Sequence, residues 1–242
     1  MNALYRLLAW LSPNFPTGAF SYSHGLEAAA EAGAVHDRAS LESWVKAIVE
    51  HGSGRVDADI LCNAYRAAAV DDAAALADAN NRGVAYRATA ELALESTQQG
   101  DAFVAVWRAA WLDGFIENRA APLPLPRPAS GESEGPAQRE DDGQCCHSAA
   151  FGAAAARAGI ALEDALLGYL QAFGGNLIAA GLRLGIVGQT DGQRILAALE
   201  PVVGRAAVAA IGRDEADFGG ATFAADLMSM AHETQYSRLF RS

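Results

Sequence analysis

The chain has 242 residues, of which 51% are hydrophobic and 8% aromatic, so it is long enough to bury a sizeable core. Its formal net charge of −11 argues against a nucleic-acid-binding protein and against binding to an anionic membrane. Cys62, Cys145 and Cys146 are too few for a disulfide framework, and no signal-peptide pattern is evident, so we expect a cytoplasmic protein.

The N-terminal segment is predicted to form two short helices separated by a proline-containing loop. The first helix covers about 1–11. Pro13 and Pro16 fix their own φ angles and push the preceding residues toward extended geometry, so 12–18 is not helical. The second helix follows over about 24–33.

Hydroxyl, acidic and aromatic side chains surround the start of this second helix. Ser21 or Ser23 is expected to cap it, and Glu27 lies near its positive end. Phe20 and Tyr22 stand on the rigid loop, where aromatic contacts with another molecule cost little ordering entropy. The loop is therefore a candidate recognition surface.

Helical patterns continue through the middle of the chain. Asp37 or Ser40 starts a helix that ends near Gly52, and another helix begins near Val56. Asp71 or Asp72 then caps the next helix.

The stretch over 84–119 is expected to be helical, with Gly100 as the point at which it would break. Aromatic residues step by four along it and are expected in the core: Phe103, Trp107, Trp111 and Phe115. Residues 121–143 hold five of the eight prolines and a net negative charge, so we expect a mobile, acidic surface loop there.

Helices resume over about 147–158, 163–186 and 190–211. The uncharged run within the second of these, 165–182, just reaches the length of a membrane span. Its glycines and amide side chains instead favour a helix buried in a bundle or at a subunit interface, so no membrane association is expected. A final helical patch over 226–240 completes an all-α single domain, 1–242, of about eight to ten helices.

Two segments resemble enzyme motifs but lack their essential parts. The Ser-Tyr-Ser-His-Gly run at 21–25 resembles a nucleophile elbow, but Ser21 occupies the place of a required glycine and no strand precedes it. His232 and Glu233 begin like a zinc-protease motif, but Tyr236 replaces its second histidine. With no nucleotide-binding glycine motif in the chain either, we expect neither an enzyme nor a cofactor.

The adjacent residues Cys145, Cys146 and His147 are the one cluster of soft metal ligands. One hypothesis is therefore a nickel or zinc carrier that binds metal through these three side chains. Against it, consecutive residues do not supply three tetrahedral ligands without strain. The other interpretation is that the two cysteines are small apolar residues at the start of a helix.

The C-terminal tail, residues 226–242, mixes the side chains that are typical of interface cores. Its apolar and basic members are Met228, Met230, Tyr236, Arg238, Leu239, Phe240 and Arg241. A terminal segment with this much apolar surface either docks on its own domain or becomes ordered on a partner.

Four blocks of the sequence resemble the UreF family of urease accessory proteins. They are SPNFPTGAFSYSHGLE at 12–27, ELALESTQQGDAFVAVWRAAW at 91–111, NLIAAGLRLGIVGQTDGQRILAALEP at 176–201 and SMAHETQYSRLFRS at 229–242. Together they span nearly the whole chain, whereas 121–147 departs from the family pattern. The resemblance implies an all-helical protein with no catalysis of its own.

The same resemblance implies a set of partners. UreF-like proteins join a UreD-like (or UreH-like) accessory protein and the nickel-carrying GTPase UreG, and the assembly delivers nickel to apo-urease with GTP hydrolysis. They are often homodimers. On this basis, partners are expected to contact the loop and the tail, on a face that carries Phe20, Ser21, Tyr22, His24, Glu27, His232, Glu233, Tyr236, Arg238, Leu239, Phe240 and Arg241.

Overall fold

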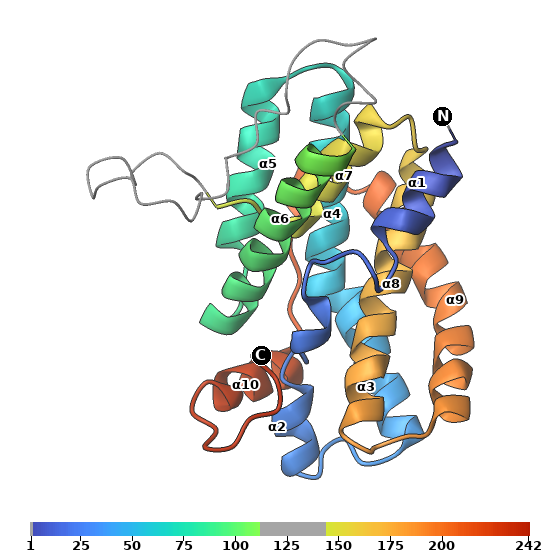
Figure 1. Cartoon of the computed structure of the whole chain (residues 1–242). Coiled ribbons are helices and arrows are strands. Elements are labelled where there is room, and N and C mark those ends of the chain that lie inside the picture. Colours follow the sequence, from blue (N-terminus) through green and yellow to red (C-terminus); the bar gives the residue numbers. More distant parts are fainter. Residues whose placement is uncertain (1, 112–143) are drawn as a thin grey trace.

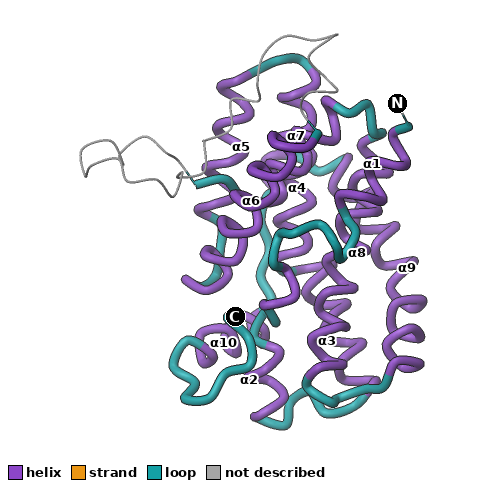
Figure 2. The backbone as a smooth tube through the Cα atoms, viewed as in Figure 1, coloured by secondary structure: helices purple, strands orange, loops and turns teal. Residues whose placement is uncertain are grey.

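The computed structural model describes residues 2–111 and 144–242, which are helical with short connections (Figures 1 and 2). No strand occurs within these ranges, so the predicted all-α class is confirmed. The expected acidic loop at 121–143 and the aromatic Phe115 lie outside the described residues.

The helices have well-defined bounds in chain order. They are α1 (Ala3–Trp10), α2 (Leu26–Glu31), α3 (Arg38–His51), α4 (Ser53–Ala69), α5 (Ala73–Ala85), α6 (Ala90–Ala110), α7 (His147–Arg157), α8 (Leu162–Arg183), α9 (Gln189–Ile211) and α10 (Phe223–His232). Short 3-10 turns occupy Ala19–Ser21 and Glu215–Asp217. Figure 1 shows α10 and the C-terminus beside α2, at the end of the domain away from α5 and α7.

Local side-chain chemistry accounts for several helix starts. Asp37 accepts the Ser40 amide at 2.8 Å and Asp72 accepts the Ala75 amide at 2.9 Å, which confirms the predicted caps of α3 and α5. The predicted continuous helix over 84–119 is wrong, because the chain leaves α5 after Ala85 and Thr89 caps a new helix, α6. Helix α6 then runs through Gly100 without a break.

Helix α4 is the centre of the domain and packs most extensively against α7. Small residues allow the two backbones to approach: a Cβ atom on Gly152 would lie 2.6 Å from the carbonyl oxygen of Leu61. Next to this contact, Trp10 packs edge-on against Phe103 and Phe151, with ring centroids 6.1 Å and 6.5 Å away. Phe103 is 1% exposed, as the aromatic stripe predicted.

Helix α8 contains the long uncharged run. By length and composition it is long enough to cross a membrane, but half of its apolar window is buried inside the domain. The face that packs inward includes Leu166, Leu170 and Leu177. This burial agrees with the predicted bundle helix.

The last helix differs from its prediction at both ends. It begins at Phe223 and ends at His232, whereas a helical patch over 226–240 was expected. The reason is tertiary: the backbone amides of Leu239 and Phe240 donate to the side chain of Glu27, so they are not available for a continuing helix.

Candidate functional site

A buried carboxylate on α2 joins the C-terminal tail to the rest of the domain. Glu27 accepts the amide of Leu239 at 2.7 Å and the amide of Phe240 at 2.9 Å. Its Oε2 atom also lies 3.1 Å from Nε2 of His232. Glu27 is only 8% exposed, and such a carboxylate is stable in the fold because these contacts replace water.

A second carboxylate, on α6, completes this site. Glu91 Oε2 lies 2.7 Å from Nδ1 of His232, and Glu91 Oε1 accepts Nη1 of Arg238 at 2.7 Å. His232 is fully buried between the two glutamates. Beside it, Glu233 accepts the amide of Ala90, at the positive N-terminus of α6.

The end of the tail pairs with the loop that precedes α2. The Ser23 amide donates to the Ser242 carbonyl at 2.7 Å, and the Arg241 amide donates to the Ser21 carbonyl at 2.8 Å. The hydroxyl of Ser242 donates to Glu95, which also lies 3.1 Å from Nδ1 of His24. Tail and loop therefore hold each other through backbone as well as side-chain contacts.

Gly25 permits the close approach of α10 to this loop. It is the N-cap residue of α2 with φ at 72°, in the left-handed region, and a Cβ atom there would lie 2.6 Å from the amide nitrogen of Ser229. The prediction that Ser21 or Ser23 occupies the N-cap position is therefore wrong. The hydroxyl of Ser23 still accepts the Glu27 amide, although at 3.4 Å, while also donating to the Ser242 carbonyl.

The expected partner face divides into a buried and an exposed set. Tyr22, His24, Glu27, His232 and Phe240 are each less than 9% exposed, so these side chains do not lie on the open surface of the free chain. Glu27 is covered by the tail, whose Leu239 and Phe240 amides bond to it. The exposed members are Phe20, Glu233, Tyr236, Arg238, Leu239 and Arg241, whereas Ser21 is half-buried.

The outward side of α10 and the tail carries two apolar residues, Phe223 and Leu227, that sequence reasoning did not single out. Phe223 and Leu227 are 82% and 56% exposed, and together with Met230 they follow the i, i+4, i+7 spacing of one helix face. Tyr236 and Leu239 continue this exposed series along the chain. We call these five residues the outer tail surface. The helical spacing was a usable signal, but the expected start at residue 226 hid Phe223.

Arg183 connects the tail to the proline loop. Its Nη1 donates to the carbonyl of Phe20, and its guanidinium carbon lies 4.3 Å from the centre of the Phe240 ring. Phe20 itself is 71% exposed. It borders a groove of about 630 Å³ between the proline loop and α8, and among the described residues that line this groove only Arg183 is charged.

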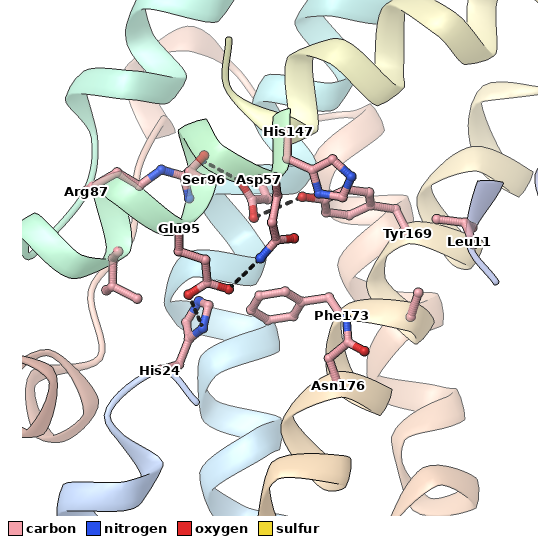
Figure 3. A pocket seen from close by; sticks show the side chains of 13 residues that line it. Leu11, His24, Asp57, Arg87, Glu95, Ser96, His147, Tyr169, Phe173 and Asn176 are labelled. Atoms are coloured by element: carbon pink, nitrogen blue, oxygen red, sulfur yellow. Dashed lines mark hydrogen bonds and ion pairs between the residues drawn. The ribbon is translucent and has the colours of Figure 1, made fainter. Parts of the chain in front are cut away.

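A small polar pocket lies between the loop before α2 and helices α4, α6, α7 and α8 (Figure 3). Its side chains bond to one another: Arg87 donates to Asp57 at 2.7 Å, and Tyr169 donates to Asp57 at 3.2 Å. The pocket volume of about 50 Å³ admits a few water molecules. These bonds stabilise the junction of the helices that line the pocket.

The Cys145–His147 segment does not form a metal site in the described structure. Both cysteines are fully buried at the start of α7, where burial raises the pKa of each thiol. Within 2–111 and 144–242, no three histidine, cysteine or acidic side chains gather to hold an ion. The cysteines instead occupy narrow spaces against glycines of α5 and α6, so the metal-carrier alternative gains no support.

Comparison with known proteins places the chain in a family. The UreF family model matches residues 35–200. A urease accessory protein UreF from Rhodopseudomonas palustris strain BisB18 is 44% identical over 240 residues, covering 99% of this chain and 92% of the relative. UreF proteins from Granulibacter bethesdensis and Azorhizobium caulinodans are 44% and 45% identical, covering 99% and 98% of this chain and 94% of each relative.

Glu27→Ala is expected to release the end of the tail, because the Leu239 and Phe240 amides lose a charged acceptor that contributes about 1.5–3 kcal/mol per bond. Amide hydrogen exchange of these two residues should become at least about tenfold faster. The matched control is Glu31→Ala on the same helix, whose exposed carboxylate contacts Gln235. Unchanged exchange at Leu239 and Phe240 in Glu27→Ala would contradict the anchoring role.

A second prediction concerns His147, whose ring packs between Phe103 and Tyr169 in the wall of the pocket. Burial lowers its pKa to about 4, so the unfolded chain takes up this proton first as the pH falls. The free energy of unfolding should therefore fall between about pH 6.5 and pH 4 by up to about 3 kcal/mol from this group. In urea unfolding, His147→Phe should lose less stability over this range than wild type.

The matched control for His147 is the same substitution at the exposed His36. His36→Phe should keep the wild-type pH dependence. Equal losses of stability in all three proteins would show that the fold does not depend on a neutral His147.

Proposed function

This chain belongs to the UreF family of urease accessory proteins, and from that premise we propose that it is a non-catalytic cytoplasmic adaptor for nickel insertion. Its proposed partners are a UreD/UreH-like accessory protein, a UreG-like GTPase and apo-urease, and the assembly couples GTP hydrolysis to delivery of nickel to the urease metallocentre. The observation that carries this proposal is a tail whose inner side is anchored in the domain and whose outer side is exposed.

The composition of the outer tail surface favours a protein partner. Exposed aromatic and aliphatic side chains on a docked helix leave apolar area in water, which a monomer rarely presents without a binding role. Arg238 and Arg241 lie among these residues, and aromatic residues with arginine are the usual anchors of protein interfaces. We propose that the UreD/UreH-like partner binds here.

In this proposal, the buried residues of the expected partner face do not contact the partner but hold the outer tail surface in position. Glu27, Glu91 and His232 contact the tail backbone and Arg238, so they position the outer tail surface without touching the partner. Phe20, by contrast, is exposed and available for direct contact. In this proposal, the proline loop near the N-terminus and the C-terminal tail therefore form one partner-binding unit.

The groove beside the proline loop supports a homodimer. Its wall on α8 includes three small residues, Ala172, Gly175 and Ala179, beside which a second helix can approach closely. Its near-uncharged lining suits an isologous contact, because like charges would otherwise meet across the twofold axis. We propose that a second copy of the chain occupies this groove, with Phe20 at its border.

The paired substitution Tyr236→Ala and Leu239→Ala is expected to weaken binding to the UreD/UreH-like partner at least about tenfold, because two exposed anchors of the interface are lost. Stability should change by less than about 0.5 kcal/mol, since both side chains are solvent-exposed in the free chain. Titration calorimetry with the purified partner gives the affinity. Leu4→Ala with Tyr5→Ala, an exposed tyrosine and leucine pair on α1, is the matched control. Wild-type affinity in the tail variant would refute the assignment.

Ala179→Arg is expected to convert a dimer into a monomer, because a guanidinium would enter the small-residue wall of the groove on both subunits. Sedimentation velocity at micromolar concentration reports the change. The control is Val208→Arg, at an exposed position of α9 away from the groove. A monomeric wild type, or a dimer that persists in Ala179→Arg, would exclude this interface.

A further inference from the structure

Both ring nitrogens of His232 face carboxylate oxygens. Nδ1 lies 2.7 Å from Glu91 and Nε2 lies 3.1 Å from Glu27. An ionised carboxylate only accepts hydrogen bonds, and a neutral imidazole has one donor and one acceptor. Two simultaneous bonds therefore require one more proton than a neutral ring and two carboxylates contain.

The charges around the ring balance only when this proton is present. Glu27 on α2 and Glu91 on α6 supply two negative charges, and Arg238 in the tail supplies one positive charge. With an imidazolium the group is neutral. With a neutral imidazole, the group would carry a net negative charge around a fully buried ring. The lone pair of the unprotonated ring nitrogen would also face a carboxylate oxygen and repel it.

The remaining ionisable groups of the packed elements are engaged elsewhere. On α6, Glu95 faces His24 and accepts the Ser242 hydroxyl. In the tail, Glu233 accepts the Ala90 amide, and on α10 Asp226 accepts the Thr222 amide. On α2, Glu31 accepts the Gln235 side chain. The other cation of the tail, Arg241, donates to Gln98, so among the described groups the positive charge beside Glu27 and Glu91 comes from Arg238 and the proton on His232.

We propose that a proton held by His232 between Glu27 and Glu91 is required for the docked tail, which makes docking of the tail sensitive to pH. Undocking separates the ring from both carboxylates and returns it to water, where an imidazole titrates near about pH 6.5. Above that pH the released ring loses its proton, so docking takes up a proton and weakens as the pH rises.

The effect of pH on partner binding rests on the proposed function, because the docked tail carries the outer tail surface. The requirement of docking for a protonated His232 is independent of the proposed function. The test therefore uses the full chain without any partner, so that its failure is distinguishable from a failure of partner binding.

The first measurement is the ring protonation state of His232, read from nitrogen-15 and carbon-13 NMR of the imidazole near neutral pH. The expected signal is that of an imidazolium, with a proton on each of the two ring nitrogens. A neutral His232 ring in the docked wild-type chain overturns the proposal.

The second measurement is the protection of the Leu239 and Phe240 amides against hydrogen exchange, corrected for intrinsic exchange. In wild type, protection should fall as the pH rises above about 6.5, approaching tenfold per pH unit. In His232→Gln, whose amide does not titrate, it should be lower and independent of pH. Equal pH dependence in both proteins overturns the proposal. If His232→Gln does not fold, Glu91→Gln provides the comparison, and its ring signal should shift toward neutral imidazole.

Discussion

The Glu27 carboxylate is the contact on which the functional end of this molecule depends. Its three partners lie 205 to 213 positions away in the chain, and two of them are backbone amides. A buried carboxylate without partners is strongly unfavourable, and a tail without an anchor would fray. Helix α2 and the tail therefore stabilise each other.

The loop before α2 is shaped by further contacts with the tail and α10. Gly25 adopts a left-handed conformation that leaves room for the α10 backbone, and Ser23 pairs with Ser242. In the docked tail, the inner side is occupied by contacts with its own chain and is not available to another protein. Recognition is then assigned to the outward side, where apolar side chains remain in water. In the proposed function, anchoring and recognition are thus separate tasks of one short segment.

The fold was predictable where local chemistry decides it. Asp37 and Asp72 cap helices through bonds within three residues, and the Phe103 stripe shows its buried face by spacing alone. The resemblance to the UreF family was also detectable from the sequence, because the blocks at the two ends of the chain are specific to that family.

The remaining features depend on contacts between distant residues. The burial of Glu27 follows from partners more than 200 positions away, and the end of α10 at His232 follows from amides that bond to Glu27. The start of α6 was missed because the periodicity continues across the break at Thr89. No local pattern reveals that His232 lies between two glutamates.

The most direct test of the account compares amide hydrogen exchange of the whole chain with and without the purified UreD/UreH-like partner. Added protection should concentrate in residues 223–241 and in the loop at 18–22, with the amides already bonded to Glu27 remaining protected in both states. New protection confined to other helices, with 223–241 unchanged, would contradict a partner-binding role for the docked tail.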